Sequence, residues 1–271
     1  MKMTGNTILI TGGGSGIGRE LALRFNALGN TVIVAGRRKE ALEQTIAGRE
    51  GMRAMVGDVE YPEAITAFAK RVVDEHPALN VLINNAGIMR REDLTGTRDL
   101  SDAEETIVTN LFGPIRLTNA LIDHLAARQN AVIVNVSSGL AFVPLSGTPT
   151  YNATKAAIHS YTVSLREQLR GKVEVIELAP PAVRTELTPG QSTRDEYMPL
   201  NAFIDEAMAL FSREPTPKEI LVERVGFLRW AERDGRFDQA VEMLNAHRAP
   251  QQPDCSIAQD HAVAAHVETG Q

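Results

Sequence analysis

Residues 7–18 read TILITGGGSGIG, a short run of apolar and β-branched side chains that passes straight into a glycine-rich turn. Residues 17–28 follow with the apolar spacing of an amphipathic helix. Because glycine permits left-handed backbone and close approach, free amide groups at the start of this helix can face a pyrophosphate. Strand, glycine turn and helix in this order predict a dinucleotide-binding unit, and a flexible surface turn is the weaker interpretation.

The same alternation of strand and helix continues along the chain, and it is the pattern that builds a parallel sheet from right-handed crossovers. The predicted strands are residues 7–11, 31–35, 52–56, 81–84, 131–136 and 173–178. The predicted helices are residues 17–28, 39–47, 62–75, 102–127, 150–170, 217–233 and 237–246. We therefore predict an α/β fold over residues 1–248: a single Rossmann-like domain whose doubly wound parallel sheet has about six strands, no seventh strand, and helices on both faces.

Composition and charge narrow the class of protein. The 271 residues are 43% hydrophobic and carry a formal net charge of −6, which gives no indication of nucleic acid or an anionic membrane as partner. The single cysteine, Cys255, excludes an intramolecular disulfide framework and favours the cytoplasm. Residues 249–271 form a polar tail that we expect to be weakly ordered. The tail also holds His261 and His266, but a fourth ligand is missing, so no metal site is predicted.

The strongest chemical signal is Ser138, followed by Tyr151 thirteen residues later and Lys155 four residues after that. Residues at i and i+4 of a helix share one face, so Tyr151 and Lys155 are expected to be neighbours. A free phenol with a pKa of roughly 10 is a poor base at neutral pH, and a nearby ammonium group lowers that pKa. We expect Tyr151 to exchange a proton near pH 7 while Ser138 polarises a carbonyl group.

Several motifs together resemble the short-chain dehydrogenase/reductase family in its compact single-domain branch. They are the glycine spacing of residues 12–18, the Asn84-Asn85-Ala86-Gly87 run, and the Ser138, Tyr151 and Lys155 set. The runs SGLAFVPL at 138–145 and APPAV at 179–183, with the helical ending, resemble its DltE-like subgroup. The resemblance covers about residues 5–190 and implies hydride transfer from a nicotinamide cofactor to a small carbonyl substrate.

The resemblance also implies roles for individual residues. It gives a catalytic tetrad of Asn110, Ser138, Tyr151 and Lys155, in which Lys155 also holds the nicotinamide ribose and Asn110 binds a water of a proton relay. Tyr151 and Lys155 therefore count as cofactor contacts too. The other implied contacts are Gly12, Gly14, Gly16, Ile17, Gly18, Asp58, Val59, Asn85, Ala86, Gly87, Pro181, Val183 and Thr185. Pro181 stands where the family has glycine, and it removes backbone freedom and a donor from that loop.

The choice between NAD and NADP depends on the end of the second predicted strand. An acidic residue there normally accepts the adenosine ribose hydroxyls in NAD enzymes. This chain instead has Arg37 and Arg38, and a guanidinium group pairs well with a 2′-phosphate. We therefore favour NADP(H), with Arg37, Arg38 and Ser15 as contacts, and NAD(H) stays open as the alternative.

These residues predict an NADP(H)-dependent oxidoreductase that interconverts a largely apolar ketone and a secondary alcohol. The expected pocket residues are Leu140, Phe142, Pro144, Leu145 and the segment 198–211, within a substrate-loop region of about 186–215. Three alternatives are weaker: a cofactor-binding sensor or scaffold without turnover, an NAD-dependent alcohol dehydrogenase of the same fold, and an epimerase or dehydratase. The intact Ser138, Tyr151 and Lys155 argue against a sensor, and residues 179–271 are too few for an epimerase.

The long predicted helices 102–127 and 150–170 are apolar on more than one face, which one sheet cannot cover. We expect them to pair with a symmetry mate, so that a homodimer is the minimum and a homotetramer the alternative. Two further polar residues lie close to the chemical set. Ser137 is expected to be structural. His159, one turn beyond Lys155, is expected to be packed or at an interface, and a position facing the substrate is the weaker alternative.

Overall fold

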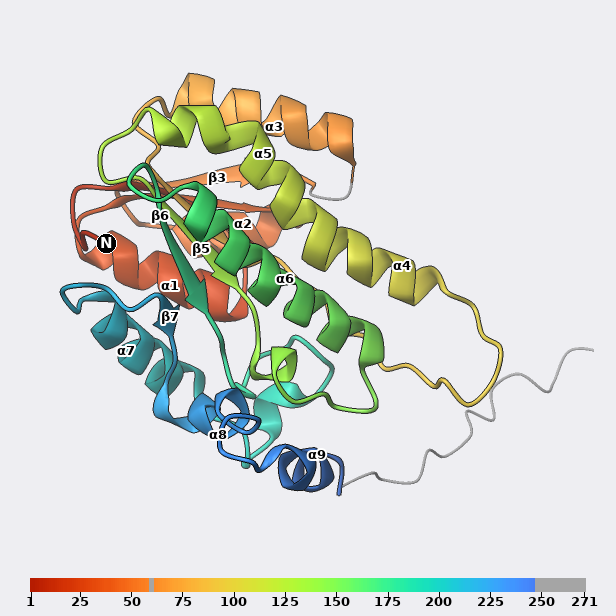
Figure 1. Cartoon of the computed structure of the whole chain (residues 1–271). Coiled ribbons are helices and arrows are strands. Elements are labelled where there is room, and N and C mark those ends of the chain that lie inside the picture. Colours follow the sequence, from red (N-terminus) through yellow and green to blue (C-terminus); the bar gives the residue numbers. More distant parts are fainter. Residues whose placement is uncertain (59–60, 247–271) are drawn as a thin grey trace, which may run out of the picture.

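One parallel sheet runs through the described part of the chain, residues 1–58 and 61–246, in the computed structural model (Figure 1). Its strands lie in the order β3-β2-β1-β4-β5-β6-β7. They are β1 (Thr7–Thr11), β2 (Thr31–Gly36), β3 (Met52–Val56), β4 (Val81–Asn84), β5 (Val132–Val136), β6 (Glu174–Leu178) and β7 (Glu219–Ile220). The order reverses between β1 and β4, and such a reversal opens a crevice beyond the carboxyl ends of the strands.

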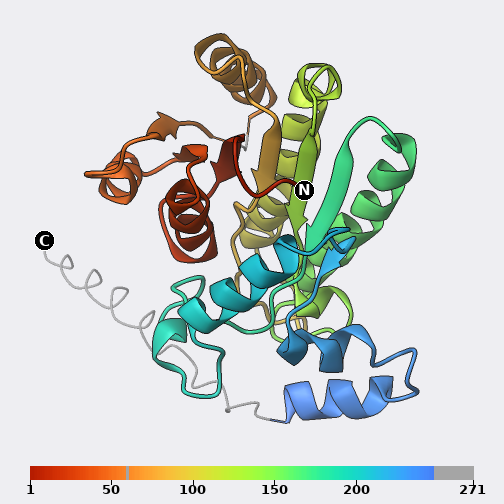
Figure 2. The same ribbon diagram turned by 90° about the vertical axis from the view of Figure 1, so that its left-hand side faces the viewer.

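Helices cover both faces of this sheet (Figures 1 and 2). One face carries α1 (Gly16–Ala27), α2 (Lys39–Ile46) and α7 (Leu200–Phe211). The other carries α3 (Pro62–Glu75), α5 (Gly113–Ala126) and α6 (Pro149–Gln168). The remaining helices are α4 (Ser101–Ile107), α8 (Gly226–Arg229) and α9 (Phe237–Asn245). The predicted doubly wound Rossmann-like fold is confirmed.

Alternate residues of β1 supply the two halves of the core. Ile8 and Ile10 join the cluster under α1 and α7, whereas Leu9 joins the cluster under α3 and α5. All three side chains are completely buried. A strand that is covered on both faces is predominantly apolar, which explains the continuous apolar run that precedes the glycine turn.

The prediction that the seventh strand is absent was wrong. Glu219 and Ile220 form β7, which pairs in parallel with Glu177 and Leu178 of β6. Two residues are too few to give the alternation by which a strand is recognised. The apolar spacing that suggested a helix over 217–233 has another cause, since Ile220 and Val225 are buried in the sheet core. Only α8 and a short 3₁₀ turn at Glu223–Val225 are helical there.

Two other predicted segments differ from the structure. The single helix expected over 102–127 is α4, a π-helical turn at Val108–Phe112, and α5 in succession. The predicted pocket segment 198–211 contributes no residue to the cleft described below. Phe203 and Phe211 of α7 are completely buried, and Phe211 packs edge-on against Phe25 of α1 with the ring centroids 5.9 Å apart. They are core residues because α7 covers the sheet beside α1.

Some expectations fall outside the described residues. Val59, and the tail of residues 249–271 with Cys255, His261 and His266, belong to this group. The described helices of residues 1–58 and 61–246 include none with both the length and the hydropathy that a bilayer span requires.

Candidate active site

A cleft of about 430 Å³ opens at the carboxyl ends of the strands, where the topology places it. Its walls come from segments that follow β1, β2, β3, β4, β5 and β6, and from the start of α6. Most of the predicted site residues line it. They are Gly12, Gly14, Ser15, Gly16, Ile17, Arg37, Arg38, Asp58, Asn85, Ala86, Gly87, Ser138, Tyr151, Lys155, Pro181, Val183 and Thr185.

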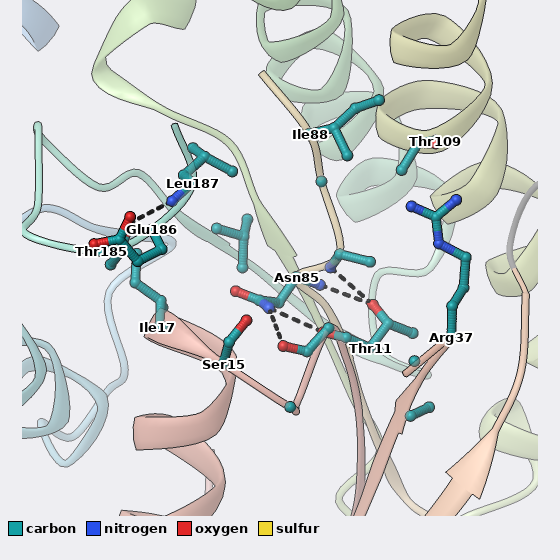
Figure 3. Close-up of a pocket in the computed structure, with 18 of the residues that line it drawn as sticks. Thr11, Ser15, Ile17, Arg37, Asn85, Ile88, Thr109, Thr185, Glu186 and Leu187 are labelled. Carbon is teal, nitrogen blue, oxygen red and sulfur yellow. Dashed lines mark hydrogen bonds between the residues drawn. The ribbon is translucent and has the colours of Figure 1, made fainter. Parts of the chain in front are cut away.

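The glycine turn after β1 is held against the end of β4 by Asn85. The side-chain amide of Asn85 donates to the carbonyl of Thr11 at 2.9 Å, and the Thr11 hydroxyl accepts from the backbone N–H groups of Asn85 and Ala86 (Figure 3). A Cβ on Gly12 would lie 2.8 Å from Asn85 Nδ2, and one on Gly18 only 2.4 Å from the same atom. Gly12 also has a φ of +68°, so its conformation and its surroundings both require glycine.

Arg37 and Arg38 close the cleft beyond the end of β2, and we call this part of its wall the arginine corner. Arg38 donates to the hydroxyl of Ser15 at 3.2 Å, so these two expected phosphate contacts touch each other. Arg37 lines the same corner, and its guanidinium lies 3.9 Å from the carboxylate of Glu105 on α4. Glu105 also binds Arg90 at 3.2 Å. Glu105 and Arg90 were not predicted from the sequence, because a long loop separates α4 from β4 and nothing local connects α4 to β2.

Ser138, Tyr151 and Lys155 meet at the inner end of the cleft. Ser138 follows β5 and accepts a hydrogen bond from the backbone N–H of Leu140 at 3.1 Å. Tyr151 and Ser138 line the cleft together, and the Ser138 side chain favours the ionised form of the Tyr151 phenol. Lys155 stands one turn along α6, and its Nζ donates to the carbonyl of Val136 at 2.8 Å. Tyr151 and Lys155 are only 6% and 4% exposed. The polar groups of Ser138, Tyr151 and Lys155 therefore lie in a part of the cleft wall that is largely shielded from solvent.

Burial controls the proton affinities in this wall. It raises the pKa of Tyr151 to about 12, although the neighbouring Ser138 side chain has the opposite effect. It lowers the pKa of Lys155 to about 8. The expected lowering of the Tyr151 pKa by Lys155 is therefore not seen, because the ammonium group binds a backbone carbonyl and desolvation of the phenolate dominates. At neutral pH the arrangement holds a phenol and a cationic amine.

Asn110 lies behind the cleft rather than on its surface. It stands in the π-helical turn, is 1% exposed, and is not among the residues that line the cleft. Its side-chain amide donates to the carbonyl of Ile88 at 2.8 Å and its Oδ1 accepts from the N–H of Ile88 at 2.8 Å. In this structure Asn110 therefore fixes the backbone after Gly87.

The loop after β6 forms the opposite wall of the cleft, with Thr185, Glu186 and Leu187 near Ile17 (Figure 3). Gln191, which the sequence analysis missed, holds this loop by donating to the carbonyl of Val183 at 2.8 Å and to the Thr185 hydroxyl at 3.2 Å. Pro181 lines the cleft without preventing this arrangement. The expected apolar residues Leu140, Phe142, Pro144 and Leu145 are not part of the lining.

The residues present fit a bound dinucleotide on two observations. Gly12, Gly14 and Gly16 line the cleft, and none of them has a side chain that would separate the backbone from a ligand. Thr109 also lines the cleft and is 5% exposed, and its hydroxyl has no hydrogen-bond partner among the described residues. A buried polar group without a partner needs an explanation, and a polar group of a ligand in the adjoining cleft would supply one.

Comparisons with known proteins agree with this geometry. The sequence profile described as "short chain dehydrogenase" matches residues 6–196. "Uncharacterized oxidoreductase DltE" of Bacillus subtilis (strain 168) is 42% identical over 254 residues, which cover 90% of this chain and 98% of that protein. A short-chain dehydrogenase from Sphingobium yanoikuyae, solved in complex with NADPH, has a TM-score of 0.73 and 27% identity, covering 92% of this chain and 99% of that one. A 3-ketoacyl-(acyl-carrier-protein) reductase from Brucella melitensis, complexed with NADH, has a TM-score of 0.72 and 26% identity, covering 79% of this chain and 93% of that one.

Proposed function

Because this chain belongs to the short-chain dehydrogenase family of oxidoreductases, we propose that it interconverts a ketone and a secondary alcohol with NADP(H) as cofactor. The observation that carries the proposal is that Ser138, Tyr151 and Lys155 are all buried and all line one cleft, with Lys155 one helical turn from Tyr151. A sensor without turnover has no need to bury a phenol, a hydroxyl and an amine together.

The chain's own groups suit the reductive direction. When bound, the nicotinamide would supply the hydride. Ser138 donates a hydrogen bond to the substrate carbonyl and polarises it. Tyr151, which burial keeps protonated at neutral pH, gives its proton to the developing alkoxide. Lys155 holds the ribose hydroxyls and keeps a positive charge beside the phenol that loses the proton.

The preference for NADP(H) rests on the arginine corner. Arg37 and Arg38 stand at the end of β2, and Arg38 touches Ser15 of the glycine turn. Two guanidinium groups and a hydroxyl at this place suit a 2′-phosphate, whereas NAD would be recognised by a carboxylate. The similar structures from Sphingobium yanoikuyae and Brucella melitensis carry NADPH and NADH respectively, so the family accommodates either.

A homodimer in the cytoplasm completes the proposal, with a homotetramer as the larger alternative. Phe112, at the end of the π-helical turn, is 44% exposed, and Val163 on α6 is 42% exposed. A second copy of the same surface would cover these outer helix faces. Light scattering measures the assembly directly.

The experiment follows the absorbance of NADPH and NADH against a panel of ketones and compares the parent protein with Tyr151→Phe. We expect turnover to fall by roughly 10²- to 10⁴-fold, with cofactor binding retained. Tyr161→Phe is the matched control, because Tyr161 is another tyrosine of α6, is partly buried, and is not among the residues that line the cleft. Equal turnover of parent and Tyr151→Phe would refute the assignment.

A further inference from the structure

A hydrogen-bonded network of polar side chains lies beside the candidate active site, toward β6 and β7. Glu177 of β6 is completely buried. One of its carboxylate oxygens accepts from the Ser137 hydroxyl at 2.5 Å, and the other lies 2.7 Å from Nδ1 of His159 on α6. Ser137 lines the cleft and is the immediate neighbour of Ser138. The network therefore connects the cleft wall to the imidazole of His159, whose side chain is 26% exposed.

Glu219 of β7 is the direct register partner of Glu177. Like charges opposite each other on neighbouring strands destabilise a sheet, and buried carboxylates need nearby cations. Arg229 of α8 binds both oxygens of Glu219, at 3.0 and 3.1 Å. His159 lies between the two carboxylates, 4.0 Å from Glu219. Two carboxylates thus face two cations, but only while His159 carries its proton.

Potential metal-binding atoms of His159, Glu177 and Glu219 lie within 4.8 Å of one another. The carboxylate oxygens are already used, however, by Ser137 and Arg229. The cluster is therefore balanced by protein cations, and its charge depends on the imidazole.

The surroundings of His159 hold its proton. The hydrogen bond to Glu177 is the largest influence and raises the pKa of the imidazole above its usual value, while burial opposes it. The charges of Glu177 on β6 and Glu219 on β7 raise the pKa further, and Arg229 on α8 lowers it. These are the charged groups that face His159 from β6, β7 and α8.

Both ends of the network reach the backbone around Ser138. Ser137, at one end, directly precedes it in the chain. At the other end, Arg229 fixes α8, whose Leu228 packs so closely that a Cβ on Gly139 would lie 2.8 Å from Leu228 Cδ1. Arg229 also lies over the ring of Phe142, 4.7 Å from its centroid, in the segment after Ser138. The network therefore contacts the segments on both sides of Ser138.

We propose that Glu177 is a positioning residue for Ser138, and that protonated His159 holds it in place, so that turnover depends on the charge of His159. This inference rests on the proposed function, because it assumes that Ser138 acts on the substrate carbonyl. A raised pKa means that the stabilising charge is present at low pH and is lost as the pH rises through the folded-state value. Above that value Glu177 and Glu219 repel each other, and the end of β5 loses its anchor.

The test compares kcat of the parent with that of His159→Gln from pH 5.5 to pH 9. The parent is expected to be roughly tenfold faster at the acid end, because small displacements of a polarising group reduce the rate steeply. The ratio of the two kcat values falls toward one as His159 loses its proton, and the KM for NADPH changes little. The ratio cancels the titration of Tyr151 and Lys155, which both proteins share. A ratio that stays constant with pH overturns the inference.

Arg166→Met is the matched control. Arg166 stands two turns further along α6 and ties the helix to β6 and to the residue before β7, by bonds of 2.9 Å to the carbonyls of Val175 and Lys218. Its loss loosens the same helix and strands away from Ser138. We expect a lower melting temperature without a pH-dependent kcat ratio. If Arg166→Met reproduces the His159→Gln profile, Glu177 and His159 are merely structural and the inference fails.

An NMR titration of His159 separates this inference from the proposed function, because it needs no turnover. In the parent we expect the pKa of the His159 imidazole to lie above its ordinary value. In Glu177→Gln we expect this pKa to move back toward the ordinary value. Normal titration in the parent overturns the inference even if Tyr151→Phe is inactive. If the pKa of His159 is raised but the protein reduces no ketone, the electrostatic network is supported and the proposed function fails instead.

Discussion

Lys155 Nζ lies 5.6 Å from the centroid of the Tyr151 ring, and both side chains are buried in the same wall of the cleft. The hydrogen bond of the amine goes to the carbonyl of Val136, not to the phenol. The two residues are thus neighbours whose proton affinities are set mainly by burial, which favours the phenol of Tyr151 and disfavours the ammonium of Lys155.

Lys155→Met is expected to change stability in a pH-dependent way. The pKa of Lys155 is about 8 in the folded protein and roughly 10.4 in an unfolded chain. Below pH 8 the buried ammonium therefore costs roughly 3 kcal/mol, and this cost disappears as the pH rises from about 8 to about 10. The variant also loses the hydrogen bond to the carbonyl of Val136, which lowers its free energy of unfolding by about 1–3 kcal/mol at every pH.

Chemical denaturation at pH 7 and pH 10 measures this difference. Relative to the parent, Lys155→Met should be less stable at pH 10 than at pH 7 by an additional 3 kcal/mol or so. Its turnover should be strongly reduced at both values. An effect on the free energy of unfolding that is equal at the two pH values contradicts the burial argument.

Arg37→Asp is expected to shift cofactor preference from NADPH toward NADH. A charge-assisted hydrogen bond contributes about 1.5–3 kcal/mol, so the Kd for NADPH should rise by roughly tenfold to a hundredfold. The introduced carboxylate can accept the ribose hydroxyls of NADH. Lys39→Asp is the control, since Lys39 is an exposed cation nearby that does not line the cleft. Equal shifts in the two variants would show that overall charge, not a phosphate contact, is responsible.

Gly18→Ala is expected to damage the dinucleotide cradle. The new Cβ would lie 2.4 Å from Asn85 Nδ2 and 2.5 Å from the carbonyl oxygen of Gly12, which is backbone and cannot move aside. Overpacking of this kind costs about 1–3 kcal/mol of stability, and the displaced turn should bind NADPH weakly. Gly96→Ala, where a Cβ meets nothing within 4 Å, should leave both unchanged. Isothermal titration and thermal melting check the pair.

The sequence was sufficient to predict those parts of the site whose residues are close together along the chain. Tyr151 and Lys155 meet because one helical turn joins them, and the glycine turn follows from the apolar β1 strand. The network around Glu177 was missed because its partners Ser137, His159 and Glu219 come from three other elements. Likewise, β7 is stabilised by pairing with a strand about forty residues earlier, and its own two residues carry no recognisable pattern.

A tertiary cap at the start of α6 positions Tyr151. Thr148, the residue before the helix, makes no side-chain capping bond, and Pro149 has no N–H. Glu92, from the loop after β4, supplies the cap by accepting from the Thr150 N–H at 2.9 Å and from the Thr150 hydroxyl at 2.7 Å. Its side chain is 2% exposed and is paired with Arg98.

Glu92→Ala should therefore lower both stability and turnover. It leaves the Thr150 N–H and the Arg98 charge without their partner, which costs about 2–4 kcal/mol, and frees the helical turn that carries Tyr151. Glu92→Gln keeps the acceptor and should recover most of kcat. Asp99→Ala is the control, because Asp99 makes similar bonds to the N–H and hydroxyl of Ser101 at the start of α4, on the surface. It should lower the melting temperature only slightly and leave kcat unchanged. If Glu92→Ala lowers the melting temperature but leaves kcat at the parent value, Tyr151 is positioned by the rest of α6 and the cap serves stability alone.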